Sequence, residues 1–276
     1  MGSRLLSYEK KDTWIDALCG VTKLTYFLCW SLTAMLTYDI RVLIVMLIIS
    51  LITFRLSETR WDQVGTVFKF VLMFMVINVL AIYLFSPNQG TQIYGTRTVL
   101  FGMTGKYALT AEQLFYELNV VMKYFTIVPS VFVFIVTTNP SEFAASLNKL
   151  GISYNIGYSI SLALRYIPDV QDDFTKIRNA QMARGIEMSK KGRLTDRIKY
   201  TAAIIFPLIF TSMRRIDTIS NAMELRGFGK NKKRTWYMGR KLKRNDWIVI
   251  AGSVVFMAAA LVFTYYDGTR FYNPFV

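Results

Sequence analysis

The sequence contains no histidine and only two cysteines, Cys19 and Cys29. Without imidazole, the chain lacks the commonest metal ligand and the commonest acid/base catalyst near neutral pH. Two cysteines are too few for a zinc ligand set, and their positions before and within an apolar run are typical of small hydrophobic residues. These absences exclude many classes of enzyme.

A phosphate-binding loop is also missing. The pattern Gly-x-x-x-x-Gly-Lys-Ser/Thr, in which backbone amides surround nucleotide phosphates, occurs nowhere in the 276 residues. The chain therefore cannot bind ATP in the usual way. We expect no catalytic residue, no metal and no cofactor in this chain.

Hydrophobic residues are abundant, at 53% of the chain with 15% aromatic, which is more than a soluble domain of this size usually carries. A helix needs about 20 mostly apolar residues to cross a membrane. Five windows qualify: 24–36, 40–54, 67–85, 118–137 and 247–265. The first two form a tight hairpin that turns at residues 37–39. The sequence predicts an all-α polytopic membrane protein with about five transmembrane helices.

The charge distribution divides the chain and orients it. Residues 138–246 hold 21 of the 33 Lys and Arg and 9 of the 18 acidic residues, and so 12 of the 15 net positive charges. Positive excess marks the cytoplasmic side of a membrane protein. We therefore expect an N-terminal transmembrane region over 1–137 with about four spans, a cytoplasmic domain over 138–246, and a last span with a short outside tail over 247–276. The N-terminus is then cytoplasmic and the C-terminus lies outside.

The cytoplasmic segment carries helix-boundary signals. One run begins at residues 139–142 and ends at Gly151, a second begins at 167–169 and ends at Gly185, and a third covers 207–227. Proline at a helix start and glycine after a helix end are the expected boundary residues. Their apolar residues recur at helical spacing, which predicts long amphipathic helices.

Two of these helices end alike. Residues 179–186 read Asn-Ala-Gln-Met-Ala-Arg-Gly-Ile, and residues 221–228 read Asn-Ala-Met-Glu-Leu-Arg-Gly-Phe. Helix capping alone favours glycine after the end and a cation in the last turn, but it requires neither the upstream Asn-Ala nor a second copy. Each arginine would stand at a helix tip, where its planar guanidinium can enter an acidic or carbonyl-lined groove of a partner. Two such tips would form a fork.

The two motifs consist of Ala183, Arg184 and Gly185, and of Leu225, Arg226 and Gly227. Paired Arg-Gly helix ends in a long cytoplasmic segment before a last span resemble the transmembrane coupling component of energy-coupling-factor transporters, a branch of the ABC transporters. The resemblance extends to residues 138–143 and 164–168. Leu225 departs from the Ala-Arg-Gly pattern of that family.

The resemblance implies a scaffold in the plasma membrane of a prokaryote. In that family the long helices are coupling helices, and each arginine docks in one of two ATPase subunits that bind ATP. Hydrolysis moves the coupling helices, and these move a separate small substrate-binding membrane protein, which carries a vitamin or a metal ion. By this resemblance, all six motif residues belong to the ATPase-docking sites, and the chain is not an enzyme.

A basic cluster lies between the second motif and the last span. It consists of Lys230, Lys232, Lys233, Arg234, Arg240, Lys241, Lys243 and Arg244. Because the cluster directly precedes a membrane helix, anionic lipid head groups explain it better than nucleic acid does.

Two other functions compete with the scaffold. Asp169, Asp172 and Asp173 could serve a membrane-embedded enzyme acting on lipid or phosphate, although an acidic first helix turn also explains them. A stand-alone carrier would need polar groups within its spans, for which Lys123 is the main candidate.

Overall fold

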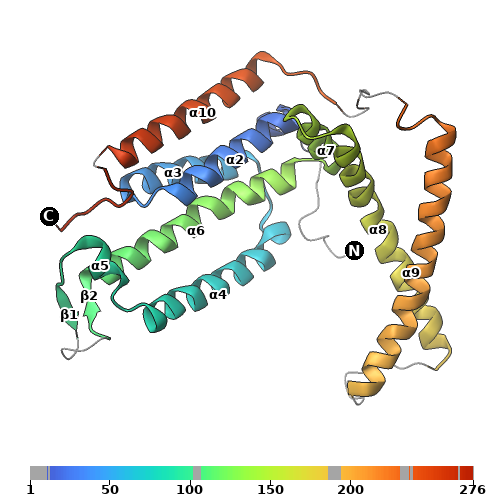
Figure 1. The fold of residues 1–276 in the computed structure, drawn as a ribbon, viewed down its shortest axis with the longest axis horizontal. Helices are drawn as coiled ribbons and strands as arrows, with labels where there is room; N and C mark the ends of the chain where they lie inside the picture. Colours follow the sequence, from blue (N-terminus) through green and yellow to red (C-terminus); the bar gives the residue numbers. More distant parts are fainter. Residues whose placement is uncertain are drawn as a thin grey trace. The chain divides into compact units, whose positions relative to one another are not determined.

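The computed structural model describes residues 11, 13–101, 107–185, 194–230, 236, 239–266 and 268–275. It is an all-α structure apart from one small two-stranded sheet, as the sequence predicted (Figure 1). The elements in order are α1 (Trp14–Ala17), α2 (Gly20–Leu36), α3 (Ile40–Leu56), α4 (Trp61–Phe85), α5 (Gln89–Tyr94), β1 (Val99–Phe101), β2 (Leu109–Thr110), α6 (Ala111–Thr137), α7 (Pro140–Lys149), α8 (Tyr154–Ala183), α9 (Leu194–Leu225) and α10 (Arg244–Tyr265).

The chain forms two compact units. The membrane unit comprises Met1–Ser146 and Arg240–Val276, and the hairpin unit comprises Leu147–Gly239. α7 begins in the first unit, and its last residues belong to the second. The membrane unit thus includes both ends of the chain and the start of the segment expected to be cytoplasmic.

All five expected spans are helices. Among the described helices, α4, α6 and α10 are long and apolar enough to cross a membrane, with 25, 27 and 22 residues. α2 and α3 have 17 residues each, which is the lower limit for a span. The expected turn between them is present, and the Asp39 carboxylate accepts a hydrogen bond from the Arg41 amide at 2.9 Å, which caps α3.

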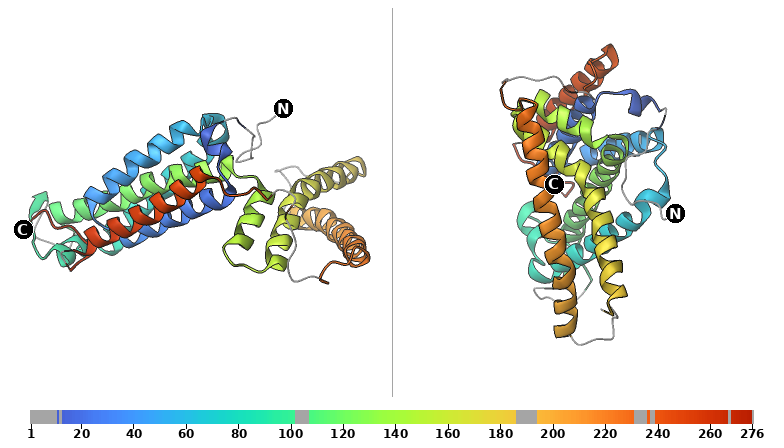
Figure 2. Two further views of the ribbon diagram at one scale, coloured as in Figure 1. Left: turned by 90° about the horizontal axis from the view of Figure 1, so that it is seen from above. Right: turned by 90° about the vertical axis from the view of Figure 1, so that its right-hand side faces the viewer.

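α6 is the central helix of the membrane unit, because it contacts α2, α3, α4 and α5, while α10 packs on α2 (Figure 2). The core between α2, α3 and α10 is apolar, with Trp30, Met46 and Ala260 buried together. Small polar residues join α3 to α6: the Ser50 hydroxyl donates to the Thr126 carbonyl at 2.9 Å. Close contacts of this kind hold helices together where the solvent is lipid.

The loop after α4 folds back onto the start of α6 through Gly90. The Gly90 amide donates to the Gln113 side chain at 2.9 Å, and a β-carbon added at Gly90 would lie 2.4 Å from the Glu112 carbonyl oxygen. No side chain fits so close to backbone.

We therefore expect Gly90→Ala to push α5 away from α6 and to destabilise the chain by about 1–3 kcal/mol, the usual cost of overpacking. Thermal unfolding in detergent measures this change. Gly65→Ala is the matched control, since a β-carbon there meets nothing within 4 Å, and because alanine is favoured over glycine inside a helix, it should not lower the melting temperature. Equal melting temperatures for both variants would contradict this packing.

Two predicted helix starts are wrong. α8 begins at Tyr154 and not at 167–169, so Pro168 lies inside it. α9 begins at Leu194 and not at Pro207. A proline removes one backbone donor, but residues before each proline are held by packing. The Tyr158 ring packs at a tilt against the Phe228 ring, with the ring centres 4.8 Å apart, and the Ala203 carbonyl accepts a hydrogen bond from Gln181 at 3.2 Å.

Candidate functional site

The predicted Arg-Gly motifs end two neighbouring helices. Arg184 is the C-cap residue directly after α8, and the following Gly185 has a left-handed φ of 83°. Gly227 after α9 has the same conformation, with a φ of 67°. Both arginines therefore occupy the same position relative to a glycine that reverses the chain.

The end of α9 is closed by two backbone hydrogen bonds. The Gly227 amide donates to the Glu224 carbonyl at 2.8 Å, and the Phe228 amide donates to the Met223 carbonyl at 2.9 Å. This pair of bonds is the Schellman motif. At the end of α8, the Gly185 amide donates to the Met182 carbonyl at 3.0 Å, which is the equivalent of the first bond. Capping thus explains both glycines.

Capping does not explain the side chains around these glycines. Arg184 and Arg226 are both exposed, and Leu225 is 89% exposed. A leucine so fully in contact with water does not stabilise the free chain, and it contributes binding free energy only if a partner covers it. The helix ends therefore have the composition of contact sites.

The two Arg-Gly motifs lie at opposite ends of an antiparallel helical hairpin formed by α8 and α9. Phe228, next to the second motif, packs on Tyr158 near the start of α8, whereas Gln181, next to the first motif, bonds to Ala203 in the first half of α9. The helix between Tyr158 and Gln181 spans about 35 Å, at about 1.5 Å per residue. The expected fork is wrong, because antiparallel packing places the two tips far apart.

Polar and apolar contacts hold the hairpin together. The Arg215 guanidinium donates to the Asp173 carboxylate at 2.5 Å, and the Arg215 and Asp173 side chains retain only 31% and 18% of their exposure. A hollow of about 420 Å³ between α8 and α9 is lined by Leu162, Tyr166, Ile219 and other residues. α8 and α9 thus pack against each other and leave a partly open apolar hollow between them.

The aspartates proposed for an enzyme do not form a metal site. Asp169 and Asp172 are exposed, and Asp173 pairs with Arg215. Because α8 starts at Tyr154, the three lie in the middle of the helix and not in its first turn. Within the described part of the chain, no group of three or more His, Cys, Asp or Glu residues could hold a metal ion.

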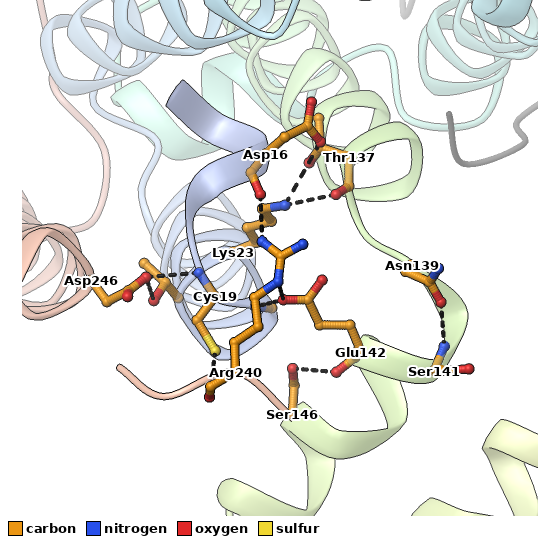
Figure 3. Close-up of polar contacts among 12 residues, drawn as sticks. Asp16, Cys19, Lys23, Thr137, Asn139, Ser141, Glu142, Ser146, Arg240 and Asp246 are labelled. Carbon is orange, nitrogen blue, oxygen red and sulfur yellow. Dashed lines mark hydrogen bonds and ion pairs between the residues drawn. The ribbon is translucent and has the colours of Figure 1, made fainter. Parts of the chain in front are cut away.

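A second polar arrangement lies where α7 leaves the membrane unit, and sequence reasoning missed it. We call it the polar joint and define it as Asp16, Lys23, Glu142, Arg240 and Asp246 (Figure 3). The Glu142 carboxylate accepts a hydrogen bond from the Gly20 amide at 2.8 Å, and its oxygen is 3.7 Å from the Arg240 guanidinium. α7 is therefore attached to α2 and to the chain segment that leads into α10.

The remaining members of the polar joint tie the same elements together. Arg240 donates to the Asp16 carbonyl at 2.8 Å, and the Lys23 ammonium donates to the Thr137 carbonyl at the end of α6 at 2.7 Å. Asp246 accepts a hydrogen bond from the Cys19 amide at 2.8 Å. Lys23, Glu142 and Asp246 are buried, so these bonds are made away from water and are costly to break.

The basic cluster is divided by this arrangement. Arg240 is exposed but has the protein partners just described. Lys230, Lys241, Lys243 and Arg244 are exposed and are not part of the polar joint. Lys232, Lys233 and Arg234 lie outside the described residues. Lys123, the candidate for a carrier, places its ammonium 3.1 Å from the centre of the Tyr38 ring.

The sequence matches one protein family over most of its length. The family is described as cobalt transport protein (CbiQ), and the match covers residues 11–237.

Individual relatives are similar over parts of the chain. A protein of Leuconostoc gelidum named energy-coupling factor transporter transmembrane protein EcfT is 27% identical over 205 residues, which are 71% of either chain. The protein of that name from Lactococcus lactis is 37% identical over 109 residues, and the match spans only 40% of its length. A Bifidobacterium longum protein named putative ABC transporter ATP-binding protein is 34% identical over 137 residues, or 47% of this chain and 17% of that protein.

Proposed function

The chain belongs to the CbiQ family of cobalt transport proteins and is the transmembrane component of an energy-coupling-factor transporter, and from this we propose that it couples ATP hydrolysis by two partner ATPase subunits to the movement of a separate substrate-binding membrane protein. The chain supplies the scaffold and the partners supply the chemistry. The cargo is a micronutrient, either a vitamin or a metal ion, and it is carried by the separate protein.

One observation carries this proposal: two like-built helix tips, each with an exposed arginine before a left-handed glycine, lie at opposite ends of one hairpin. Tips separated by most of the length of α8 cannot enter the same groove. They suit two partners, or two copies of one partner, each with an acidic or carbonyl-lined groove. An ATPase pair meets that requirement. A relative in which a similar segment forms part of an ATP-binding protein supports a functional link between the two kinds of chain.

The surface of α9 supports a contact with the substrate-binding membrane protein. Six large apolar side chains of this helix are 42–61% exposed: Ile205, Phe206, Ile209, Phe210, Met213 and Ile216. They recur at spacings of three and four residues, which places them along one broad face. We propose that the small substrate-binding membrane protein covers this face, since an apolar patch of this size is unfavourable in water.

The proposed orientation follows the charges. The hairpin unit lies on the cytoplasmic side of a prokaryotic plasma membrane, where ATP is available, with the N-terminus inside and the C-terminus outside. The exposed Lys241, Lys243 and Arg244, at the start of α10, then face the anionic head groups of the inner leaflet.

Co-purification tests the proposal. The chain, extracted in mild detergent from its own cells, should bring with it two ABC ATPase subunits and one small membrane protein, identified by mass spectrometry. A chain that purified alone and transported a solute in ATPase-free liposomes would instead be a carrier, and metal-dependent turnover by the isolated chain would make it an enzyme. Either result would overturn the scaffold function.

Leu225→Ala gives a more local prediction. Because Leu225 is 89% exposed, the substitution should leave the melting temperature of the isolated chain unchanged. It should weaken binding of one ATPase subunit by about fiftyfold, since three side-chain carbons, at about 0.8 kcal/mol each, no longer become buried on docking. Titration of the purified ATPase measures the affinity. Unchanged affinity would show that Leu225 does not contact that subunit.

A further inference from the structure

An open apolar groove runs along the membrane unit between α2, α4 and α6. Its volume is about 940 Å³, and its lining includes Met35, Phe70, Phe74, Ile127 and Val131. Phe70 and Phe74 on α4 are 63% and 58% exposed, and the apolar window of α4 contains no buried residue. The groove therefore opens toward the surface that faces lipid.

A single charged residue, Lys123, lies among the lining side chains of this groove. Its ammonium contacts the Tyr38 ring at 3.1 Å from the ring centre and donates to the Met35 carbonyl at 3.3 Å. The Arg270 guanidinium lies 5.3 Å from the same ring. Two cations thus converge on Tyr38, at one end of the groove.

Neither cation has an acidic partner within the described parts of the chain. Lys123 contacts a carbonyl and a ring, and Arg270 contacts the rings of Tyr38 and Phe271. Two like charges on one ring repel each other, and the cost grows where the surroundings are apolar. A negative charge placed between them removes this cost.

The ligand that matches the site combines a long apolar chain with a negative head. We propose that the groove binds an anionic phospholipid, with an acyl chain among the side chains of α2, α4 and α6 and the phosphate between Lys123 and Arg270. Tyr38 and its stacking neighbour Tyr116 then lie at the level of the head groups, where tyrosine is enriched. Because the site lies at the turn between α2 and α3, it is separate from the basic cluster before α10.

Photolabelling in nanodiscs tests this site. The complete chain, with any partners that co-purify, is placed in phosphatidylcholine nanodiscs that contain a small fraction of phosphatidylglycerol with a photoreactive acyl chain. Peptides from α2, α4 and α6 should be labelled, and phosphatidylcholine with the same photoreactive chain should label them much less. Each cation near an anionic lipid contributes a roughly constant amount to the binding free energy. Lys123→Gln or Arg270→Gln should therefore each lower the affinity for phosphatidylglycerol about fivefold, and both together about thirtyfold.

Two further variants separate the site from general effects. Lys69→Gln removes a cation from α4 that is exposed and outside the groove lining, and it should not alter labelling. Val71→Trp fills the groove from α4 without changing charge, and it should abolish labelling while the chain remains monodisperse. Equal labelling by both lipids in the wild-type chain would overturn the proposal. So would labelling that survives the double Gln variant, or that is lost equally in Lys69→Gln.

Discussion

Replacing both Arg184 and Arg226 with alanine is expected to release the ATPase subunits and to abolish ATP-driven uptake. Each arginine is exposed at a helix tip, and a guanidinium that docks beside a buried carboxylate of a partner leaves that charge unpaired when it is removed. The cost of such a loss is about 2–5 kcal/mol for each site. Co-purification of the ATPases and uptake of labelled substrate in reconstituted vesicles measure the effect.

The matched control removes two arginines from the same helices away from the tips. Arg178 and Arg214 are exposed on α8 and α9, so Arg178→Ala with Arg214→Ala changes the net charge equally and should retain both ATPases. Because the tips lie far apart, each single variant at Arg184 or Arg226 should weaken the binding of one ATPase subunit and leave the other subunit bound. Full ATPase binding and uptake in the Arg184/Arg226 double variant would refute the docking role.

Glu142→Ala is expected to uncouple ATP hydrolysis from uptake while the ATPases remain bound. Glu142 holds the first turn of α7 to Gly20 and Arg240, and α7 leads directly into the hairpin unit. Loss of this carboxylate leaves the buried Gly20 amide unsatisfied, at a cost of about 2 kcal/mol. The Arg240 side chain is 43% exposed, so solvent compensates for much of its lost pairing. A loosened joint would absorb the motion of the hairpin instead of transmitting it.

The measurement compares ATP hydrolysis, uptake and melting temperature in one preparation. Hydrolysis should persist, uptake should fall, and the melting temperature should drop. Glu142→Gln keeps an acceptor for the Gly20 amide and should be intermediate. Asp62→Ala removes an exposed carboxylate that lies 3.9 Å from the Arg60 guanidinium. It should change none of the three values, because an exposed ion pair contributes little. If uptake in Glu142→Ala matched the wild type, the polar joint would have no part in coupling.

The sequence was informative where a local pattern determines structure. Long apolar windows predicted five helices, of which α4, α6 and α10 are long and apolar enough to cross a membrane. Glycine at 185 and 227 predicted the ends of α8 and α9, because a left-handed residue after a helix is a local requirement. Proline was misleading at 168 and 207, since each helix is held on both sides by contacts with its partner helix and tolerates one missing hydrogen bond.

The joint and the separation of the tips depend on contacts far apart in the sequence. Gly20 and Glu142 are separated by 122 residues, and Cys19 and Asp246 by 227, so no periodicity brings them together. Glu142 looked like an ordinary acidic residue in a first helix turn. Likewise, two similar helix ends suggested a fork until the antiparallel pairing of Tyr158 with Phe228 placed them at opposite ends of the hairpin.

Site-specific photocrosslinking from the two tips tests the central claim most directly. A photoreactive amino acid at position 183, or at position 225, leaves both arginines in place and reports what lies against each tip in the assembled transporter in its membrane. The two-partner scaffold predicts that each position captures an ATPase subunit, and that a chain labelled at both positions captures two subunits at once. Capture of no ATPase from either position, with the ATPases present in the same membranes, would contradict it.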